Sequence, residues 1–137
     1  MRILLVEDNI ADIIIVQEAF EELGNSYRLD YVKEGAKVMD KVKESFSKTG
    51  VPPYALIFLD INIPSPNGRE ILCELKRNRQ YADIPVVILT TSSDSRDIEF
   101  AYRYQVNAFV TKPTEIDEFL ESIKGIVRFW EKVGGNR

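Results

Sequence analysis

Apolar residues along the chain follow two repeating patterns, short unbroken runs and longer stretches with helical spacing. The short runs are typical of strands buried on both faces, and the longer stretches are typical of helices with one apolar side. The predicted strands are residues 2–6, 27–32, 54–60, 84–89 and 108–110. The predicted helices are residues 10–23, 36–46, 69–78, 94–104 and 115–133. Strand and helix alternate five times, which predicts an α/β fold with one parallel five-stranded sheet covered on both faces.

Four of the five helical stretches carry an apolar side that we expect to face the sheet. The residues predicted to face inward are Ile13, Ile15, Val16, Ala19, Phe20 and Leu23 in the first helix, Val38, Met39, Val42 and Phe46 in the second, Ile71, Leu72 and Leu75 in the third, and Ile116, Phe119, Leu120, Ile123, Val127 and Trp130 in the last. Ile14 and Phe129 fall outside these sides, so they are candidate contacts for a partner. Trp130 is a third candidate, although its position also fits the core.

Polar residues follow four of the five predicted strands. They are Glu7 and Asp8, Asp60, Thr90, and Lys112. In a doubly wound sheet these strand ends share one edge, so residues far apart in sequence come close together. Clustered carboxylates repel, and a hard divalent cation with oxygen ligands would compensate them. A capping role for Asp8 or Asn9 at the first helix explains one residue but not the acidic pair.

Composition narrows the classes of function. The net charge of −4 argues against non-specific binding to nucleic acid, which needs a basic surface. No apolar stretch is long enough for a membrane span and no signal peptide is visible, which predicts a cytoplasmic protein without a membrane partner. The single cysteine, Cys73, excludes an internal disulfide and is predicted to be a small buried apolar residue. The absence of histidine excludes histidine-based catalytic triads and zinc sites.

Four segments together resemble a two-component response-regulator receiver domain. They are ILLVEDN at 3–9, IFLDINIP at 57–64 with Gly68, PVVILTTS at 85–92 and AFVTKP at 108–113. The resemblance implies a flavodoxin-like receiver fold with strand order 2-1-3-4-5 and five helices. It also implies a receiver domain at 1–133, a short tail at 134–137 and no output domain. The loop before the third strand and the Phe129–Trp130 pair are similar to single-domain regulators paired with phytochrome-like histidine kinases.

The resemblance also implies a role for each residue at the predicted site. Asp60 would be the phosphoacceptor. Asp8 and Asp60 would bind Mg²⁺ (or Mn²⁺) through their carboxylates, Asn62 through its backbone carbonyl and Glu7 through water. Lys112 would contact the phosphoryl oxygens.

Further residues match the family's switch and lifetime positions. Thr90 would be the switch hydroxyl, and Phe109 would be the aromatic side chain that rotates with it. Asn62 and Ser92 match positions that tune the lifetime of the phosphoryl group. The Lys112–Pro113 peptide bond is expected to be cis.

One turn departs from the family pattern. Gln105 stands where a glycine is usual after the fourth helix. Glycine would relieve a left-handed backbone conformation there. We therefore expect either that Asn107 takes this conformation or that the turn differs.

The predicted function is that of a stand-alone response regulator. It would accept a phosphoryl group from a sensor histidine kinase and signal through a phosphorylation-dependent surface to an unknown protein or to a second copy of itself. It would catalyse only its own phosphorylation and dephosphorylation. One alternative is a phosphorelay intermediate that passes the group to a histidine phosphotransfer protein.

Three more distant alternatives are weaker. A haloacid-dehalogenase-like phosphatase usually needs a second carboxylate where this chain has Asn62, and the chain has no room for a cap domain. A flavodoxin-like electron carrier would have a hydroxyl-rich phosphate loop in place of Glu7 and Asp8. A receiver-like domain that is never phosphorylated would lack part of the required set, and every residue is present.

Overall fold

The computed structural model describes residues 1–47 and 53–135. The elements are β1 (Arg2–Val6), α1 (Ile10–Leu23), β2 (Arg28–Val32), a 3₁₀ turn (Gly35–Lys37), α2 (Val38–Ser47), β3 (Leu56–Leu59), α3 (Gly68–Arg77), β4 (Val86–Thr90), α4 (Ser95–Arg103), β5 (Ala108–Thr111) and α5 (Ile116–Gly135). The loop predicted before the third strand and the last two residues of the predicted tail lie outside the described residues. No helix in the described part of the chain combines the length and the apolar composition needed to cross a membrane.

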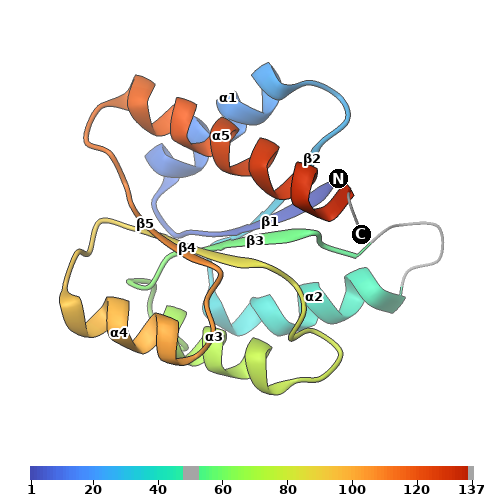
Figure 1. The fold of residues 1–137 in the computed structure, drawn as a ribbon, viewed down its shortest axis with the longest axis vertical. Helices are drawn as coiled ribbons and strands as arrows, with labels where there is room; N and C mark the ends of the chain where they lie inside the picture. Colours follow the sequence, from blue (N-terminus) through green and yellow to red (C-terminus); the bar gives the residue numbers. More distant parts are fainter. Residues whose placement is uncertain (48–52, 136–137) are drawn as a thin grey trace.

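The five strands form one parallel sheet in the order β2-β1-β3-β4-β5, which confirms the predicted fold. Helices α1 and α5 cover one face of this sheet, and α2, α3 and α4 cover the other (Figure 1). From β1 the sheet therefore grows in two directions, with β2 added on one side and β3, β4 and β5 on the other. Side chains at the carboxyl ends of β1 and β3 flank the crevice that this change of direction creates.

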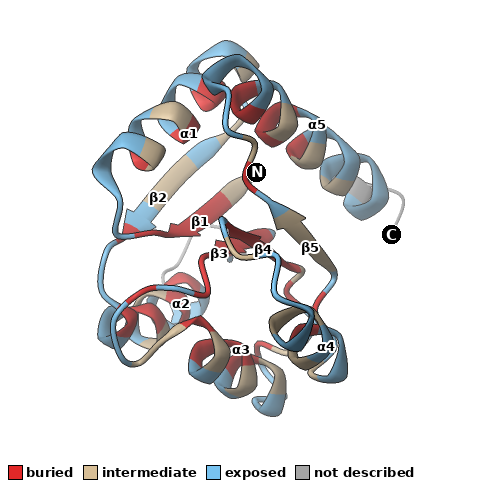
Figure 2. Cartoon of the chain, turned by 90° about the vertical axis from the view of Figure 1, so that its left-hand side faces the viewer, coloured by how far each residue is buried: buried red, intermediate tan, exposed pale blue. Residues whose placement is uncertain are grey.

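The core consists of two apolar clusters, one on each side of the sheet. Successive residues of a strand point to opposite faces, so Ile3 and Leu5 join the cluster under α1 and α5, while Leu4 and Val6 join the cluster over α2, α3 and α4. The central strands and the inward sides of the helices are buried (Figure 2). This double burial explains why the strands read as unbroken apolar runs.

Most predicted helix sides are confirmed, and the exceptions lie at helix ends. Phe46, in the last turn of α2, is 36% exposed and rests against the ring of Tyr81 at 5.2 Å. Ile116 is the first residue of α5 and is 60% exposed, so its predicted place in the core is wrong. Both residues lie in a terminal turn of their helix. Cys73 is half-buried rather than fully buried.

Two predictions about the backbone are corrected. The cis peptide bond found in the described residues joins Ser65 and Pro66, whereas Lys112–Pro113 is trans. With this trans bond the Lys112 side chain already reaches the carboxylates at the sheet edge. At the end of α4, Gln105 itself takes the left-handed conformation, with φ of 65°.

Hydrogen bonds around the Gln105 turn explain why a non-glycine residue is held there. The Gln105 N–H donates to the Tyr102 carbonyl at 3.1 Å, and the Val106 N–H donates to the Ala101 carbonyl at 3.0 Å. This is a Schellman end, and the buried side chain of Val106 anchors it. Asn107 does not adopt the left-handed conformation that was one of the two expectations. Its side-chain oxygen instead accepts the Val86 N–H at 2.8 Å, at the start of β4.

Candidate functional site

The structure brings the predicted strand-end residues together at one edge of the sheet. Glu7 follows β1, Asp60 follows β3, Thr90 ends β4, and Lys112 follows β5. Register holds these ends level, because Val6 pairs with Leu59 and Thr90 pairs with Thr111. All four side chains are buried although each is polar or charged. Buried charges are rare unless they are paired, so this edge needs an electrostatic explanation.

The Lys112 ammonium is the cation at the centre of this edge. Its Nζ lies 2.6 Å from Glu7 Oε2, 2.8 Å from Asp12 Oδ2 and 3.3 Å from Asp60 Oδ2. Asp12 is not among the residues that the strand ends predict for the site. It stands in the first turn of α1, and a helix that begins at the sheet edge carries its first-turn side chains over that edge. The position of Asp12 in the first turn after β1 is the sequence feature that could have indicated its place at the site.

The pKa values at this edge reflect more negative charge than one lysine can balance. Burial, together with the nearby charge of Asp60, raises the pKa of Glu7 to about 7, against the opposing effect of Lys112. Burial on its own would lower the pKa of Lys112, but hydrogen bonds to Asp12 and Glu7 outweigh it and raise that pKa. The lysine therefore stays charged, and the carboxylates around it remain incompletely compensated.

The acidic residues form a donor set that fits a divalent cation. Each of Glu7, Asp8 and Asp60 offers a carboxylate oxygen, and these oxygens lie within 4.8 Å of one another. Asp8 is exposed, while Glu7 and Asp60 are buried, so the cluster opens to solvent on one side. Oxygen ligands with an open side suit Mg²⁺ or Mn²⁺, which keep some of their water when bound to proteins.

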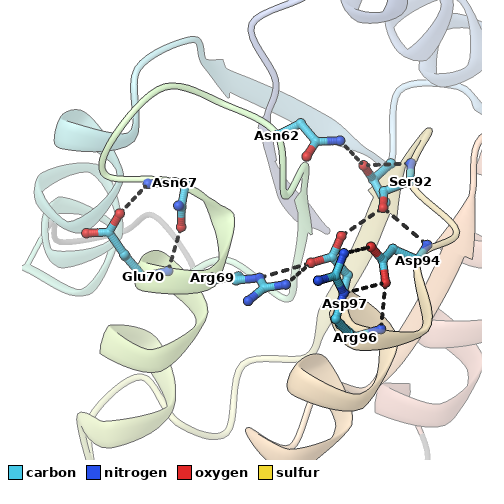
Figure 3. Close-up of polar contacts among 9 residues, drawn as sticks. Asn62, Asn67, Arg69, Glu70, Ser92, Asp94, Arg96 and Asp97 are labelled. Carbon is cyan, nitrogen blue, oxygen red and sulfur yellow. Dashed lines mark hydrogen bonds and ion pairs between the residues drawn. The ribbon is translucent and has the colours of Figure 1, made fainter.

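Asn62 connects the phosphoacceptor candidate to the hydroxyl at the end of β4. Its backbone N–H donates to Asp60 Oδ1 at 3.0 Å and fixes one face of that carboxylate. Its side-chain Nδ2 donates to Thr90 Oγ1 at 3.1 Å (Figure 3). The Ser92 N–H donates to the same oxygen at 3.3 Å. Phe109 is half-buried and packs against the cluster on the side of α3 and α4.

Two features hold the loop that presents Asp60 and Asn62. The Gly68 N–H donates to the Ile61 carbonyl at 3.1 Å, and a side chain at Gly68 would overlap the Asp60 carbonyl oxygen. Asn67 and Glu70 form a capping box that fixes the start of α3 immediately afterwards. The absence of a Cβ at Gly68 therefore lets α3 begin directly against the site.

Together these features define a flavodoxin-like α/β domain with a cluster of acidic residues at its strand ends that fits a divalent cation. The profile of the response regulator receiver domain matches residues 3–124, so the chain belongs to that family. Among its relatives, the response regulator Rcp1 of Synechocystis sp. is 36% identical over 128 residues, which cover 93% of this chain and 87% of Rcp1.

Solved structures agree with this assignment. The phosphorylated cyanobacterial phytochrome response regulator RcpA is 34% identical, with a TM-score of 0.86 over 96% of this chain and 94% of RcpA. The Mn²⁺-bound form of Rcp1 is 36% identical, with a TM-score of 0.84 over 94% of this chain and 93% of that one. The protein is therefore a response-regulator receiver domain of two-component signalling, and the haloacid-dehalogenase alternative gains no support.

Proposed function

We propose that Asp60 accepts a phosphoryl group from the phosphohistidine of a sensor histidine kinase, in a reaction that depends on Mg²⁺ or Mn²⁺. The observation that carries this proposal is the Lys112 ammonium, which lies within hydrogen-bonding reach of both Glu7 and Asp60 in a buried site with surplus negative charge. Such a site favours arrival of a cation and then of a group whose oxygens the lysine can bind.

The Asp60 carboxylate is held at both of its oxygens. The Asn62 N–H holds Oδ1, and Lys112 holds Oδ2. In the reaction a carboxylate oxygen forms a bond to phosphorus while the bond from phosphorus to the kinase imidazole breaks, and the imidazole nitrogen takes the electron pair. Positioning and charge neutralisation are the protein's share of this chemistry.

The metal ion would be held by Glu7, Asp8, Asp60 and the Asn62 carbonyl. Its chemistry is to draw charge from the phosphoryl oxygens. The Lys112 ammonium then moves its contact from Asp60 to those oxygens. Later a water oxygen attacks phosphorus, the bond from phosphorus to the Asp60 oxygen breaks, and inorganic phosphate leaves, which restores the free carboxylate. The protein catalyses its own phosphorylation and dephosphorylation and no other reaction. The phosphorylated state of RcpA and the Mn²⁺-bound state of Rcp1 support both parts of this proposal.

The phosphoryl group is read out by a change of surface. Thr90 turns its hydroxyl to the new oxygens, and Phe109 moves into the space that Thr90 leaves. Asn62 and Ser92, which both contact Thr90 Oγ1, set the lifetime of the phosphoryl group. The result is a phosphorylation-dependent surface for a downstream protein.

The proposed kinase is phytochrome-like, because RcpA is a phytochrome response regulator. A second copy of the chain is a further candidate partner, since Ile14 is 51% exposed and Phe129 is 57% exposed with Trp130 beside it. Sedimentation with and without beryllofluoride and Mg²⁺ tests this: a monomer in both states at high concentration excludes it. The bounds of the receiver domain at 1–133 and a cytoplasmic location stay predictions.

The proposal is tested by labelling with acetyl phosphate or with a phytochrome-like kinase. The wild type and Asp30→Asn, which changes a half-buried carboxylate away from the site, are expected to take up one phosphoryl group in Mg²⁺. Asp60→Asn is expected to take up none. Stoichiometric labelling of Asp60→Asn would overturn the assignment.

A further inference from the structure

Helix α4 is held to the rest of the domain by few apolar contacts. Within the described chain, Ala101 is the buried residue of this helix. The neighbouring central strand β4, by contrast, is buried throughout. Polar contacts therefore have a larger share in fixing α4 than in fixing the sheet. An element held in this way can shift at small cost in free energy.

Arg69, near the start of α3, contacts α4 at two points. Its guanidinium donates to Asp97 Oδ1 from Nε at 3.0 Å and also from Nη2 (Figure 3). Its Cζ lies 4.9 Å from the centre of the Phe100 ring. Asp97 and Phe100 are three residues apart and therefore share one side of α4. One side chain from α3 thus fixes both the position and the rotation of this helix.

The same Asp97 carboxylate is linked to the switch hydroxyl through Ser92. The Ser92 Oγ donates to Asp97 Oδ2 at 2.8 Å, and the Ser92 N–H donates to Thr90 Oγ1 at 3.3 Å. A continuous series of contacts therefore joins Arg69, Asp97, Ser92 and Thr90, and we call it the Arg69 line. It runs from α3 through α4 to the buried end of β4.

This line opposes the rotation of Thr90 that phosphorylation requires. When Thr90 turns Oγ1 to an oxygen on Asp60, the contact with the Ser92 N–H breaks. Ser92 can follow only if Asp97 moves or releases it, and Arg69 holds Asp97. Contacts made in only one of two states shift the equilibrium toward that state.

We propose that Arg69 is a positioning residue that, through Asp97 and Ser92, stabilises the unphosphorylated arrangement of Thr90 and so limits how readily the site takes a phosphoryl group. This inference rests on the proposed function of Asp60. It assigns regulation of that site to a side chain that contacts none of the phosphoryl-binding residues directly.

The chain offers a matched control in the same region. Arg96 also pairs with an aspartate at the start of α4, with its Nη2 2.8 Å from Asp94 Oδ2. This pair lies within a single turn, and the Arg96 side chain is 83% exposed. It connects α4 to no other element. Losing it removes an arginine–aspartate pair but leaves the Arg69 line intact.

The experiment is a titration of each protein with beryllofluoride at saturating Mg²⁺, followed by ¹H–¹⁵N NMR of the Ser92 and Gly68 amides. Arg69→Gln is expected to bind beryllofluoride about threefold to tenfold more tightly than the wild type, the range in which residues along a coupled network act. Arg69→Lys keeps a positive charge beside Asp97, and its beryllofluoride affinity is expected to fall between those of the wild type and Arg69→Gln. Arg96→Gln should match the wild type, and the Mn²⁺ affinity of all four proteins should be equal.

Each result distinguishes the two proposals. Equal or weaker beryllofluoride binding by Arg69→Gln, in a protein whose thermal unfolding shows that it is folded, overturns the role of Arg69 alone. An equal gain in Arg96→Gln also overturns it, because surface charge would then be the cause. If the wild type itself binds no beryllofluoride, the proposed function fails, and the role of Arg69 fails with it.

Discussion

Two clusters in which a cationic side chain meets carboxylate oxygens lie toward opposite ends of the strands. At the amino-terminal edge, Arg2 Nη2 lies 2.8 Å from Asp30 Oδ2, and the Tyr54 hydroxyl donates to the same oxygen at 2.6 Å. The Arg2 guanidinium also lies over the Tyr54 ring. At the carboxyl-terminal edge, Lys112 faces three carboxylates.

The two clusters differ in charge balance, and the pKa values record the difference. Burial alone would raise the pKa of Asp30, but hydrogen bonds from Tyr54 and Arg2 more than compensate, so that pKa is lowered. The pKa of Glu7 is raised instead. The Asp30 carboxylate is balanced by partners within the protein, whereas the one ammonium of Lys112 faces three carboxylates, so we expect a ligand to complete that cluster. Surplus buried charge at strand ends therefore marks function, and balanced charge marks structure.

Removing Lys112 is expected to give the largest effect. Lys112→Met should accept phosphoryl groups from acetyl phosphate about a hundredfold more slowly, because a donor to the developing charge is lost. It should bind Mn²⁺ more tightly than the wild type, because the competing ammonium is gone. Lys124→Met removes a buried lysine of α5 that pairs with Glu22 and Glu121, and it should change neither property. Unchanged phosphorylation in Lys112→Met would contradict the assigned role.

Neutralising one carboxylate in each cluster should have opposite effects on stability. Asp30→Asn is expected to lower the free energy of unfolding by about 1–3 kcal/mol, since it leaves partly buried donors without a charged acceptor. Asp60→Asn is expected to raise it in metal-free buffer, because repulsion with Glu7 is relieved. Urea unfolding in EDTA near neutral pH measures both, with the exposed Asp40→Asn as the control. A loss of stability in Asp60→Asn as large as in Asp30→Asn would remove the distinction.

Metal ions should stabilise only the protein with an intact acidic edge. At ten times its dissociation constant, Mg²⁺ is expected to add about 1.4 kcal/mol to the stability of the wild type. Asp30→Asn should keep this gain and Asp60→Asn should lose most of it. Thermal unfolding with and without Mg²⁺ is the measurement. An equal gain in all three proteins would show that the ion binds elsewhere.

The smallest expected effect is on how the stability difference between wild type and Asp30→Asn depends on pH. Because the pKa of Asp30 is lowered in the folded state, its contribution to stability is complete above its unfolded value of about 3.9 and is lost as the pH falls through the folded value. The difference in stability between wild type and Asp30→Asn should therefore be largest near neutral pH and shrink below about pH 4. A constant difference across this range would show that Asp30 acts through packing and not through charge.

The sheet and its reactive edge were predictable because both depend on local signals. Buried parallel strands need unbroken apolar runs, and a polar residue at the end of such a run reaches the shared edge whatever its distance in sequence. This placed Glu7, Asp60, Thr90 and Lys112 correctly at one edge. It did not reveal Asp12, because an acidic residue in a first helical turn has the same pattern whether it caps a helix or pairs with a distant lysine.

What escaped prediction depends on contacts between helices. Arg69 and Asp97 are 28 residues apart on helices that meet only in the folded chain, and neither stands out by spacing. Ile116 and Phe46 stand in terminal turns of their helices, and the spacing of apolar residues does not show whether another element covers such a turn. The conformation of Gln105 depends on the anchoring of Val106 in the core.

The surplus charge at the carboxyl-terminal edge is expected to receive a metal ion and then a phosphoryl group on Asp60. Mass spectrometry of the wild type after treatment with acetyl phosphate, with peptide mapping, tests it most directly. We predict one phosphoryl group, on the peptide that contains Asp60, formed in Mg²⁺ and absent in EDTA. A phosphoryl group on any other residue, or equal labelling without metal, would contradict the account.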